Sequence, residues 1–512
     1  MNLSGITIGD GAVLTGALLE GKFDTITGHQ LTRYDFSDDL AWGGTADLDG
    51  GGILAARYLN GTIVDARYVR NGDDSDAIQG AIDWLGVTTE GTGIVYCGPR
   101  ATAYSLTDQI NLSAGVHIVC HPLAEFSLDF NGYAFNGNNS DDVVIEGFRL
   151  DGNARPGGMV QLLLPSHRLK LLRCEMGIVG SGADDYCNGY LLDSNGYGSD
   201  ELEISDCVVR GGGGICEVQN SDNIKVVRNS LKDIEDPLTD SPAITINLLD
   251  ACPYADVRDN YMYLHEANLT VDRGIQVRNS NYAVVCGNTT YGGNEEAILV
   301  TGSNEAHVFG NRCFNGHQDQ SVPNNACIIG LVNSDRCLVD SNVATGNHAI
   351  DGIIPVHHKY GIGLNNSAGT GPYGASGAGC LNCVVTNNFL SNIAAVGAPP
   401  TGNYRNDYDS LPIFCDPADN NFNSGNRVMA KQSASVAGTA GAAAQVIACP
   451  GRCAAIGAAG DEFRTCFLAV DSAGAYFGAC VTSYGVGSAD TLGITGTGAW
   501  PANNNVYYAL DC

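Results

Sequence analysis

The stretch Val226-Val227-Arg228-Asn229 decides the fold, because the chain repeats its pattern many times. Apolar phrases closed by asparagine return at Asn260, Asn288, Asn311, Asn342 and Asn388, with spacings of 31, 28, 23, 31 and 46 residues counted from Asn229. Asp206 takes the same position 23 residues upstream. Recurrence at such intervals indicates stacked structural units. Alternating apolar positions closed by Asn or Gly predict that each unit is built from strands, so we expect a β-solenoid.

A second strand phrase precedes the first in several repeats, so each coil of the solenoid holds at least two strands. It occupies residues 214–221, 274–280, 297–303 and 327–334. Asparagine suits the tight corner between two strands, because it tolerates the left-handed backbone region. Asparagine side chains stacked at such a corner can also hydrogen-bond one another along the column. Helical and leucine-rich repeats are disfavoured, because their leucine patterns are absent.

Composition and charge limit the partners. The chain of 512 residues contains 67 Gly and carries a net charge of −30, which indicates many turns and a soluble, acidic exterior. Phosphates would repel such a surface, so nucleic acid is not an expected partner. Residues 432–450 are too polar to insert into a membrane, and residues 1–13 lack the features of a secretory signal.

The cysteines are expected to be structural. Nineteen is an odd number, and many cysteines fall on strand positions, among them Cys207, Cys286, Cys327, Cys337 and Cys383. We interpret these as buried thiols that fill small apolar positions.

A short helix is predicted immediately before the first repeats. Asp73, Asp74 and Ser75 provide carboxylates and a hydroxyl that accept hydrogen bonds from free amides at a helix N-terminus. The apolar residues Ala77, Ile78, Ala81 and Ile82 then recur at helical spacing. Such a helix would cover the apolar end of the first coil, which is otherwise an open edge.

This helix motif, followed by Gly93-Ile94-Val95-Tyr96 and Gly115-Val116-His117-Ile118-Val119, resembles the beginning of pectate-lyase-like right-handed parallel β-helices. It is most similar to the branch that contains bacteriophage tailspikes and polysaccharide depolymerases. The resemblance implies an all-β protein with a β-helix over residues 63–425, preceded by a virion attachment segment at residues 1–62. The alternating strands within residues 426–512 predict an antiparallel β-module, which would cap the helix or hold a homotrimer together.

Four carboxylates lie just before strand phrases and are the predicted catalytic residues: Asp240, Asp272, Glu295 and Glu296. Neighbouring strands lie about 4.8 Å apart, so equivalent positions on nearby coils come close together. Glycoside hydrolysis uses two carboxyl groups, about 5 Å apart for retention and roughly 6.5–9.5 Å apart for inversion. Solvated surface charge is the alternative interpretation of these acids.

Further loop residues are predicted to contact substrate: His317, Asp319, His357, His358 and Tyr291. The two adjacent histidines suit an acidic sugar, and a tyrosine ring suits the face of a sugar. No cofactor is expected. The alternative is calcium, for which the candidate ligands are Asp184-Asp185 and Asp200-Glu201.

Taken with the resemblance, these residues predict a trimeric virion tailspike that binds and depolymerises a bacterial surface polysaccharide. Two alternatives stay open. One is a non-enzymatic virion fibre or head-decoration adhesin, and the other is a free-standing polysaccharide lyase or hydrolase.

Overall fold

The structure is a computed structural model. It describes residues 6–8, 12–14, 52–59, 62–68, 73–86, 93–153, 155–177, 189–194, 196, 198–210, 214–232, 244–264, 273–293, 295–314, 327–345, 360–365, 367, 379–391, 413–414, 419–433, 435–437, 444–448, 464–470, 476–485, 491–496 and 505–511. Of residues 6–8, 12–14, 58–59, 62–68, 232, 360, 391, 414 and 427 onward it describes the backbone alone.

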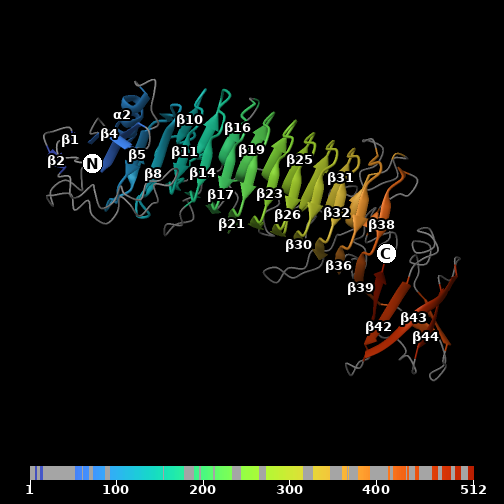
Figure 1. Cartoon of the computed structure of the whole chain (residues 1–512). Helices are drawn as coiled ribbons and strands as arrows, with labels where there is room; N and C mark the ends of the chain where they lie inside the picture. Colours follow the sequence, from blue (N-terminus) through green and yellow to red (C-terminus); the bar gives the residue numbers. More distant parts are fainter. Residues whose placement is uncertain are drawn as a thin grey trace. The chain divides into compact units, whose positions relative to one another are not determined.

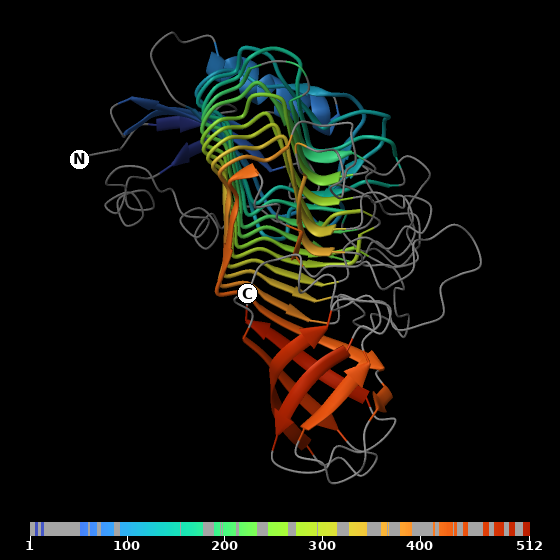
Figure 2. The ribbon, with the colours of Figure 1, turned by 90° about the vertical axis from the view of Figure 1, so that its right-hand side faces the viewer.

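The chain divides into two units, Met1–Asp256 and Val257–Cys512. In each unit, strands of successive coils pair in parallel to form a right-handed parallel β-helix with three sheets, here called sheets I, II and III (Figure 1; Figure 2). The chain passes through them in the order I, II, III, and then begins the next coil. The predicted β-solenoid is thereby confirmed.

The strands of the first unit are short. Sheet I contains β7 (Ile110–Asn111), β10 (Phe135–Gly137), β13 (Val160–Leu162), β16 (Tyr190–Ser194), β19 (Gly214–Gln219) and β22 (Ile244–Leu249). Sheet II contains β5 (Gly93–Cys97), β8 (Val116–Cys120), β11 (Val144–Glu146), β14 (Lys170–Leu172), β17 (Glu203–Ser205) and β20 (Lys225–Val227). Sheet III contains β6 (Tyr104–Leu106), β9 (Phe126–Leu128), β12 (Arg149–Asp151), β15 (Glu175–Met176), β18 (Val208–Arg210) and β21 (Ser230–Lys232).

The second unit continues the same pattern after β23 (Asp256–Arg258). Sheet I contains β25 (Arg273–Arg278), β28 (Ile298–Thr301), β31 (Cys327–Val332), β34 (Tyr360–Leu364) and β37 (Ile413–Phe414). Sheet II contains β26 (Val284–Cys286), β29 (His307–Phe309), β32 (Leu338–Asp340), β35 (Val384–Thr386) and β38 (Phe422–Ser424). Sheet III contains β24 (Tyr261–Tyr263), β27 (Thr289–Tyr291), β30 (Arg312–Phe314), β33 (Val343–Thr345), β36 (Phe389–Ser391) and β39 (Arg427–Ser433).

Left-handed backbone at the corner between sheets II and III turns the chain within two residues. Arg228 has φ 56°, Gly310 has φ 64° and Asn387 has φ 55°. In each case the next residue is a buried asparagine, which directs its side chain into the corner. This corner explains why the repeated phrase ends in asparagine.

The asparagines of the second unit form a hydrogen-bonded ladder. The Asn288 backbone N–H and its Nδ2 both donate to Asn311 Oδ1 at 3.0 Å, and Asn311 donates in the same way to Asn342. Nδ2 of Asn311 also donates to the carbonyl of Val285 at 2.9 Å. The ladder runs through Asn260, Asn288, Asn311, Asn342, Asn388 and Asn426. The predicted stacking of asparagines is confirmed.

The first unit fills the same corner differently, which corrects the assignment of Asp206. Asp206 has φ 57° and is the residue of the left-handed turn, whereas Cys207 takes the buried position and its N–H donates to Asn229 Oδ1 at 3.0 Å. The side chains buried there in earlier coils are Cys174 and Phe148. Phe148 stacks on Phe126 with ring centroids 4.0 Å apart, so aromatic packing replaces the ladder in these earlier coils.

Serines form a second ladder at the corner between sheets I and II. The N–H of Ser140 donates to Ser166 Oγ at 3.1 Å, and the N–H of Ser166 donates to Ser199 Oγ at 3.0 Å. Ser280 and Ser303 pair in the same way in the second unit, at 2.9 Å. Both ladders satisfy buried polar groups and hold successive coils in register.

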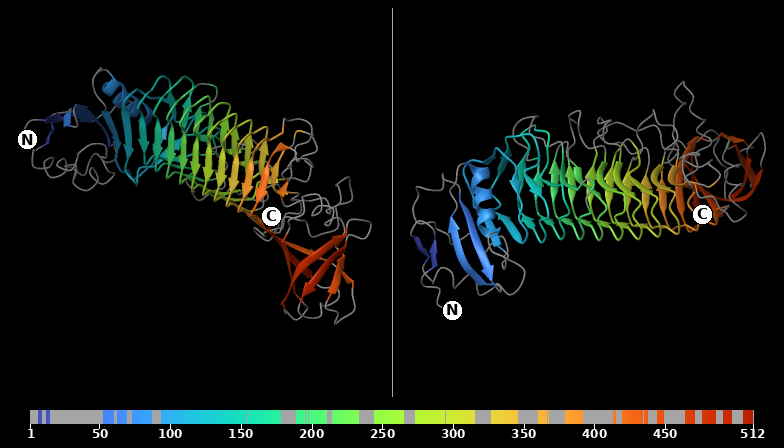
Figure 3. Two further views of the ribbon diagram at one scale, coloured as in Figure 1. Left: turned by 45° about the vertical axis from the view of Figure 1, so that its right-hand side comes forward. Right: turned by 90° about the horizontal axis from the view of Figure 1, so that it is seen from above.

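The predicted helix is α2 (Asp74–Gly86), and its buried face includes Ala77, Ile78, Ala81 and Ile82 as expected. Asp73 Oδ1 accepts the Asp76 N–H at 3.0 Å. Arg100 Nη1 donates to both oxygens of Asp74, at 2.7 and 2.8 Å. α2 lies against β5 at the start of the β-helix (Figure 3).

Two antiparallel arrangements flank the parallel sheets. β3 (Ile53–Leu59) pairs with β5 and with β4 (Thr62–Tyr68), both antiparallel, and β1 (Ile6–Ile8) pairs with β2 (Ala12–Leu14). Beyond β39 the strands are β40 (Ser435–Ala437), β41 (Ala444–Ala448), β42 (Arg464–Val470), β43 (Tyr476–Gly485), β44 (Thr491–Gly496) and β45 (Asn505–Asp511). Their backbone pairings are antiparallel. No helix in the described part of the chain is long and apolar enough to cross a membrane.

The described cysteines are free thiols and, apart from the half-buried Cys286, they are buried. This confirms the prediction for Cys207, Cys327, Cys337 and Cys383. Burial raises the pKa of the Cys313 thiol to about 12, so this group stays protonated and contributes by packing.

Replacing one rung of the asparagine ladder tests its contribution to stability. We expect Asn311→Ala to lower the free energy of unfolding by roughly 1–3 kcal/mol, because it leaves buried groups of Asn288 without an acceptor. Asn138→Ala, at an exposed position, should change it by less than about 0.5 kcal/mol. Chemical denaturation measures both, and equal effects would contradict a special role for the ladder.

The cap of α2 should be sensitive to acid. Hydrogen bonds from the Asp76 amide and the Thr107 hydroxyl lower the pKa of Asp73 below 3.8. A depressed folded-state pKa stabilises the protein above the unfolded value, and this contribution is lost as pH falls through the folded value. The thermal midpoint of the wild type should therefore exceed that of Asp73→Ala at about pH 6, and the difference should shrink below about pH 3.5. If the difference between the two thermal midpoints is constant across this pH range, the charge of Asp73 does not contribute to stability.

Candidate functional site

A column of polar side chains follows the outward face of sheet I in the first unit. Asn136 pairs in register with Gln161, Gln161 with Asp193, Asp193 with Glu217, and Glu217 with Asn247. Each lies between buried inward residues of its strand, so alternation along the strand directs it outward. We call Asn136, Gln161, Asp193, Glu217 and Asn247 the polar column.

Neutral donors connect the members of the polar column. Asn247 Nδ2 donates to Glu217 Oε2 at 3.0 Å, and the Tyr190 hydroxyl reaches the same oxygen at 3.3 Å. Gln161 Nε2 lies 3.5 Å from Asp193 Oδ2. The Tyr133 hydroxyl also hydrogen-bonds the Asp193 carboxylate.

Glycines make room for the two tyrosine rings. A Cβ atom at Gly158 would clash with the ring of Tyr133, and a Cβ atom at Gly214 would clash with the ring of Tyr190. Tyr190 and Gly214 are register partners on β16 and β19. Each ring therefore packs over a glycine of the following coil, and its hydroxyl is held beside a carboxylate.

The electrostatics keep both phenols protonated. Burial raises the pKa of Tyr133, and the negative charge of Asp193 raises it further. Burial likewise raises the pKa of Tyr190, followed by the charge of Glu217. Each tyrosine thus keeps its proton and serves as a hydrogen-bond donor beside a carboxylate.

Two predicted catalytic residues, Glu295 and Glu296, lie together beside Arg273 in the second unit. The Arg273 Nε lies 2.9 Å from Glu296 Oε2, and its Nη2 pairs with Glu295 Oε2. Glu296 is 0 % exposed, so its carboxylate faces the guanidinium and not solvent. This geometry makes Glu296 an anchor of Arg273, and a catalytic role for the two glutamates stays a prediction.

Tyr291, a predicted substrate contact, belongs to an aromatic stack on sheet III. Its ring lies 4.6 Å from that of Phe314 at an interplanar angle of 9°, and 6.1 Å from that of Tyr263. Because neighbouring rings adjoin Tyr291 on both sides, the partly exposed Tyr261 offers more surface to a ligand.

The remaining predicted site residues lie outside the described residues: Asp240, Asp272, His317, Asp319, His357 and His358. Asp184 and Asp185 do as well. Asp200 is described, and it lies 3.3 Å from His167 Nδ1. Within the described ranges, no group of three His, Cys, Asp or Glu side chains is arranged to hold a metal ion.

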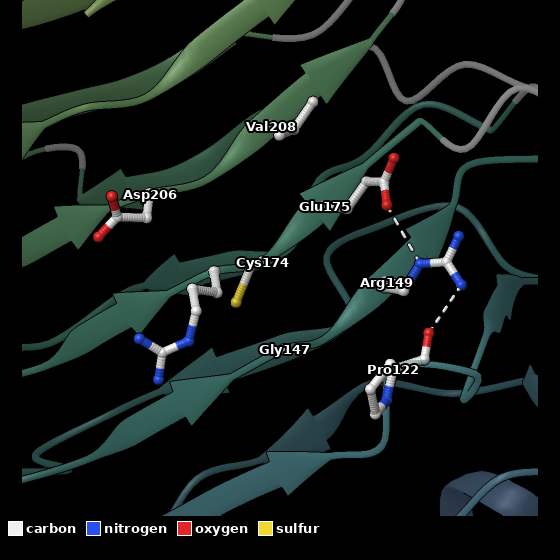
Figure 4. Close-up of a pocket in the computed structure, with 8 residues that line it drawn as sticks. Pro122, Gly147, Arg149, Cys174, Glu175, Asp206 and Val208 are labelled. Carbon is white, nitrogen blue, oxygen red and sulfur yellow. Dashed lines mark hydrogen bonds and ion pairs between the residues drawn. The ribbon is translucent and has the colours of Figure 1, made fainter. Parts of the chain in front are cut away.

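A pocket of about 390 Å³ opens at the corner between sheets II and III (Figure 4). Its charged groups already have protein partners. Arg149 lies 3.1 Å from Glu175 and donates to the Pro122 carbonyl at 3.0 Å, and Asp206 pairs with Arg228 at 2.7 Å. The pocket therefore offers few unsatisfied charged groups to a ligand.

Sequence reasoning missed Asp193 and Glu217 because it searched for acids just before strand phrases. Both acids lie in the middle of a strand, between buried residues. The available signal was an acidic residue at one outward position of consecutive strands, in Leu192-Asp193-Ser194 and Cys216-Glu217-Val218.

No protein-family model matches the chain, and no curated protein matches it. Among solved structures, the Dettilon tailspike protein is 12% identical, covers 86% of this chain and 91% of its own, and has a TM-score of 0.42. The A-module of the Azotobacter vinelandii mannuronan C-5 epimerase AlgE6 is 13% identical, with coverage of 69% and 95% and a TM-score of 0.38. PfbA, a surface adhesin of Streptococcus pneumoniae, is 8% identical, with coverage of 70% and 87% and a TM-score of 0.41.

Removing Arg273 distinguishes an anchor from a catalytic pair. We expect Arg273→Met to destabilise the protein by about 3–5 kcal/mol, because it leaves the buried Glu296 without its guanidinium partner. Adding Glu296→Gln should recover much of the loss. Denaturation curves of the single and double variants measure this coupling, and additive losses would contradict the anchor role.

Proposed function

We propose that this chain is a receptor-binding spike protein of a virion that binds a bacterial surface polysaccharide. The observation that carries the proposal is the polar column. It places an amide or a carboxylate at the same outward position of five consecutive strands. Strands repeat about every 4.8 Å, so the half-buried Gln161, Asp193 and Glu217 offer a straight array of polar groups to a linear polymer, with the buried Asn136 and Asn247 at the two ends of the column.

The chemistry of the column suits carbohydrate. Planar amide and carboxylate groups form paired hydrogen bonds with sugar hydroxyls, and Asn136, Gln161 and Asn247 supply both donors and acceptors. The serine ladder holds the coils that carry these residues. The array is therefore preorganised, which reduces the entropic cost of binding.

The virion assignment and the homotrimer rest on the resemblance of the α2 motif to tailspikes. In this proposal, residues 1–62 join tail or capsid proteins, residues 63–425 form the receptor-binding β-helix, and residues 426–512 form the trimerisation or capping module. The antiparallel backbone pairing of β42, β43 and β45 supports such a module. A trimer would have three times the 53.4 kDa mass of one chain.

Depolymerisation is the enzymatic part of the proposal. Glycoside hydrolysis would use paired carboxylates from Asp240, Asp272, Glu295 and Glu296. One observation favours the alternative of a non-enzymatic fibre or head-decoration adhesin: Glu296 is buried against Arg273. In that alternative the same polar column binds the polysaccharide and no bond is cleaved.

Binding to an array of purified bacterial surface polysaccharides tests the proposal. The full chain should bind at least one of them, and a double Asn136→Ala, Gln161→Ala variant should bind it at least about tenfold more weakly. Asn138→Ala is the matched control, because Asn138 is an exposed asparagine next to β10 and outside the column. Failure of the wild type to bind any polysaccharide would contradict the proposed function.

The same preparation separates the enzyme from the adhesin. Size-exclusion chromatography of the bound polysaccharide should show shorter products after incubation with the wild type, and no shortening with Asp272→Asn combined with Glu295→Gln. An unchanged polymer with the wild type identifies the adhesin. A monomeric mass for the protein would contradict the trimeric spike.

A further inference from the structure

We infer that the polar column, as the binding surface of the proposed function, selects a glycan without acidic groups. Asp193 and Glu217, fixed by Tyr133 and Tyr190, determine this selectivity. The inference rests on the proposed function and adds the chemical class of the ligand.

The paired carboxyl groups of Asp193 and Glu217 disfavour an acidic ligand. Asp193 and Glu217 are register partners on adjacent parallel strands, so their backbones lie about 4.8 Å apart. Tyrosine and amide donors hydrogen-bond both carboxyl groups. Two neighbouring carboxylates on one face repel uronate, sialate or phosphate groups and accept hydrogen bonds from hydroxyls.

The polar column also contains a buried hydrogen-bond acceptor without a donor, Asn136 Oδ1. Asn136 is only 8 % exposed. Its Nδ2 donates to Asn111 Oδ1 at 3.2 Å, whereas its own Oδ1 is buried and accepts no hydrogen bond from the described residues. A buried acceptor without a donor is unfavourable, and a ligand hydroxyl would supply that donor. Ionised carboxylate and phosphate groups carry no hydrogen-bond donor.

The two tyrosine rings beside the carboxyl groups are held rigidly. The rings of Tyr133 and Tyr190 pack over Gly158 and Gly214, where any Cβ atom would clash with them. Fixed rings hold the two hydroxyls beside Asp193 and Glu217 before ligand arrives. This arrangement is preorganisation of the kind that raises affinity and selectivity.

The charge of the whole chain acts in the same direction. With 26 Lys and Arg against 56 Asp and Glu, long-range repulsion slows the approach of polyanionic glycans and leaves neutral ones unaffected. Asp193 and Glu217 then add short-range repulsion of acidic glycans once the glycan contacts the polar column.

The test compares neutral and acidic polysaccharides on full-length protein. The polysaccharides that bind most tightly on the array should lack acidic groups in their repeat unit. An acidic polysaccharide that binds should bind at least about tenfold more tightly after chemical reduction of its carboxyl groups. An Asp193→Asn, Glu217→Gln variant should bind neutral glycan several-fold more weakly and should lose most of the preference for the reduced form.

Salt and hydroxyl variants supply the controls. The preference should shrink between about 20 mM and 500 mM NaCl, because salt screens exposed charges. Tyr133→Phe and Tyr190→Phe should weaken neutral-glycan binding several-fold with little loss of stability. Tyr104→Phe removes a buried hydroxyl that donates to Gly98 at 2.9 Å, and it should alter stability without altering binding.

The outcomes separate the two proposals. Binding of acidic and reduced polysaccharides with equal affinity, or a preference unchanged in the Asp193→Asn, Glu217→Gln variant, would overturn the selectivity while leaving polysaccharide binding intact. Absence of binding to every polysaccharide overturns the proposed function, and the selectivity with it.

Discussion

Hydrogen bonds passed from each corner asparagine to the next keep the coils of the second unit in register. Each ladder asparagine before Asn426 uses its backbone N–H and its Nδ2 to bind the following Oδ1, so neither group is left unsatisfied in the interior. A shift of one residue would turn inward side chains outward and would break this ladder. Serine ladders impose the same register at the corner between sheets I and II.

Because the coils stack in register, residues that are far apart in the sequence become neighbours on the surface. Asp193 and Glu217 are 24 residues apart in sequence (217 − 193), yet they are paired on adjacent strands. The same constraint aligns Asn136, Gln161 and Asn247 with them and places Tyr190 over Gly214. The polar column is therefore a direct product of stacking, and its spacing is that of the strands themselves.

Much of this architecture could be predicted from the sequence, because the repeated asparagine corresponds to one backbone conformation. The left-handed turn before Asn229 or Asn311 and the α2 cap at Asp73 are local features, and local patterns reveal them. The shift from Asp206 to Cys207 escaped prediction, because a buried thiol and a corner asparagine fill the same position but look unlike in sequence. Arg273 escaped as well, since its contact with Glu296 joins different coils. The assignment of Asp193 and Glu217 needed the strand register itself, which depends on loop lengths between coils.

The most direct test of the account is a crystal structure of the full-length protein with a bound neutral oligosaccharide. The account predicts a sugar chain along sheet I of the first unit, with hydroxyl groups within hydrogen-bond distance of Asp193, Glu217 and Asn136 Oδ1. An oligosaccharide bound elsewhere, with Asp193 and Glu217 free of contact, would contradict it.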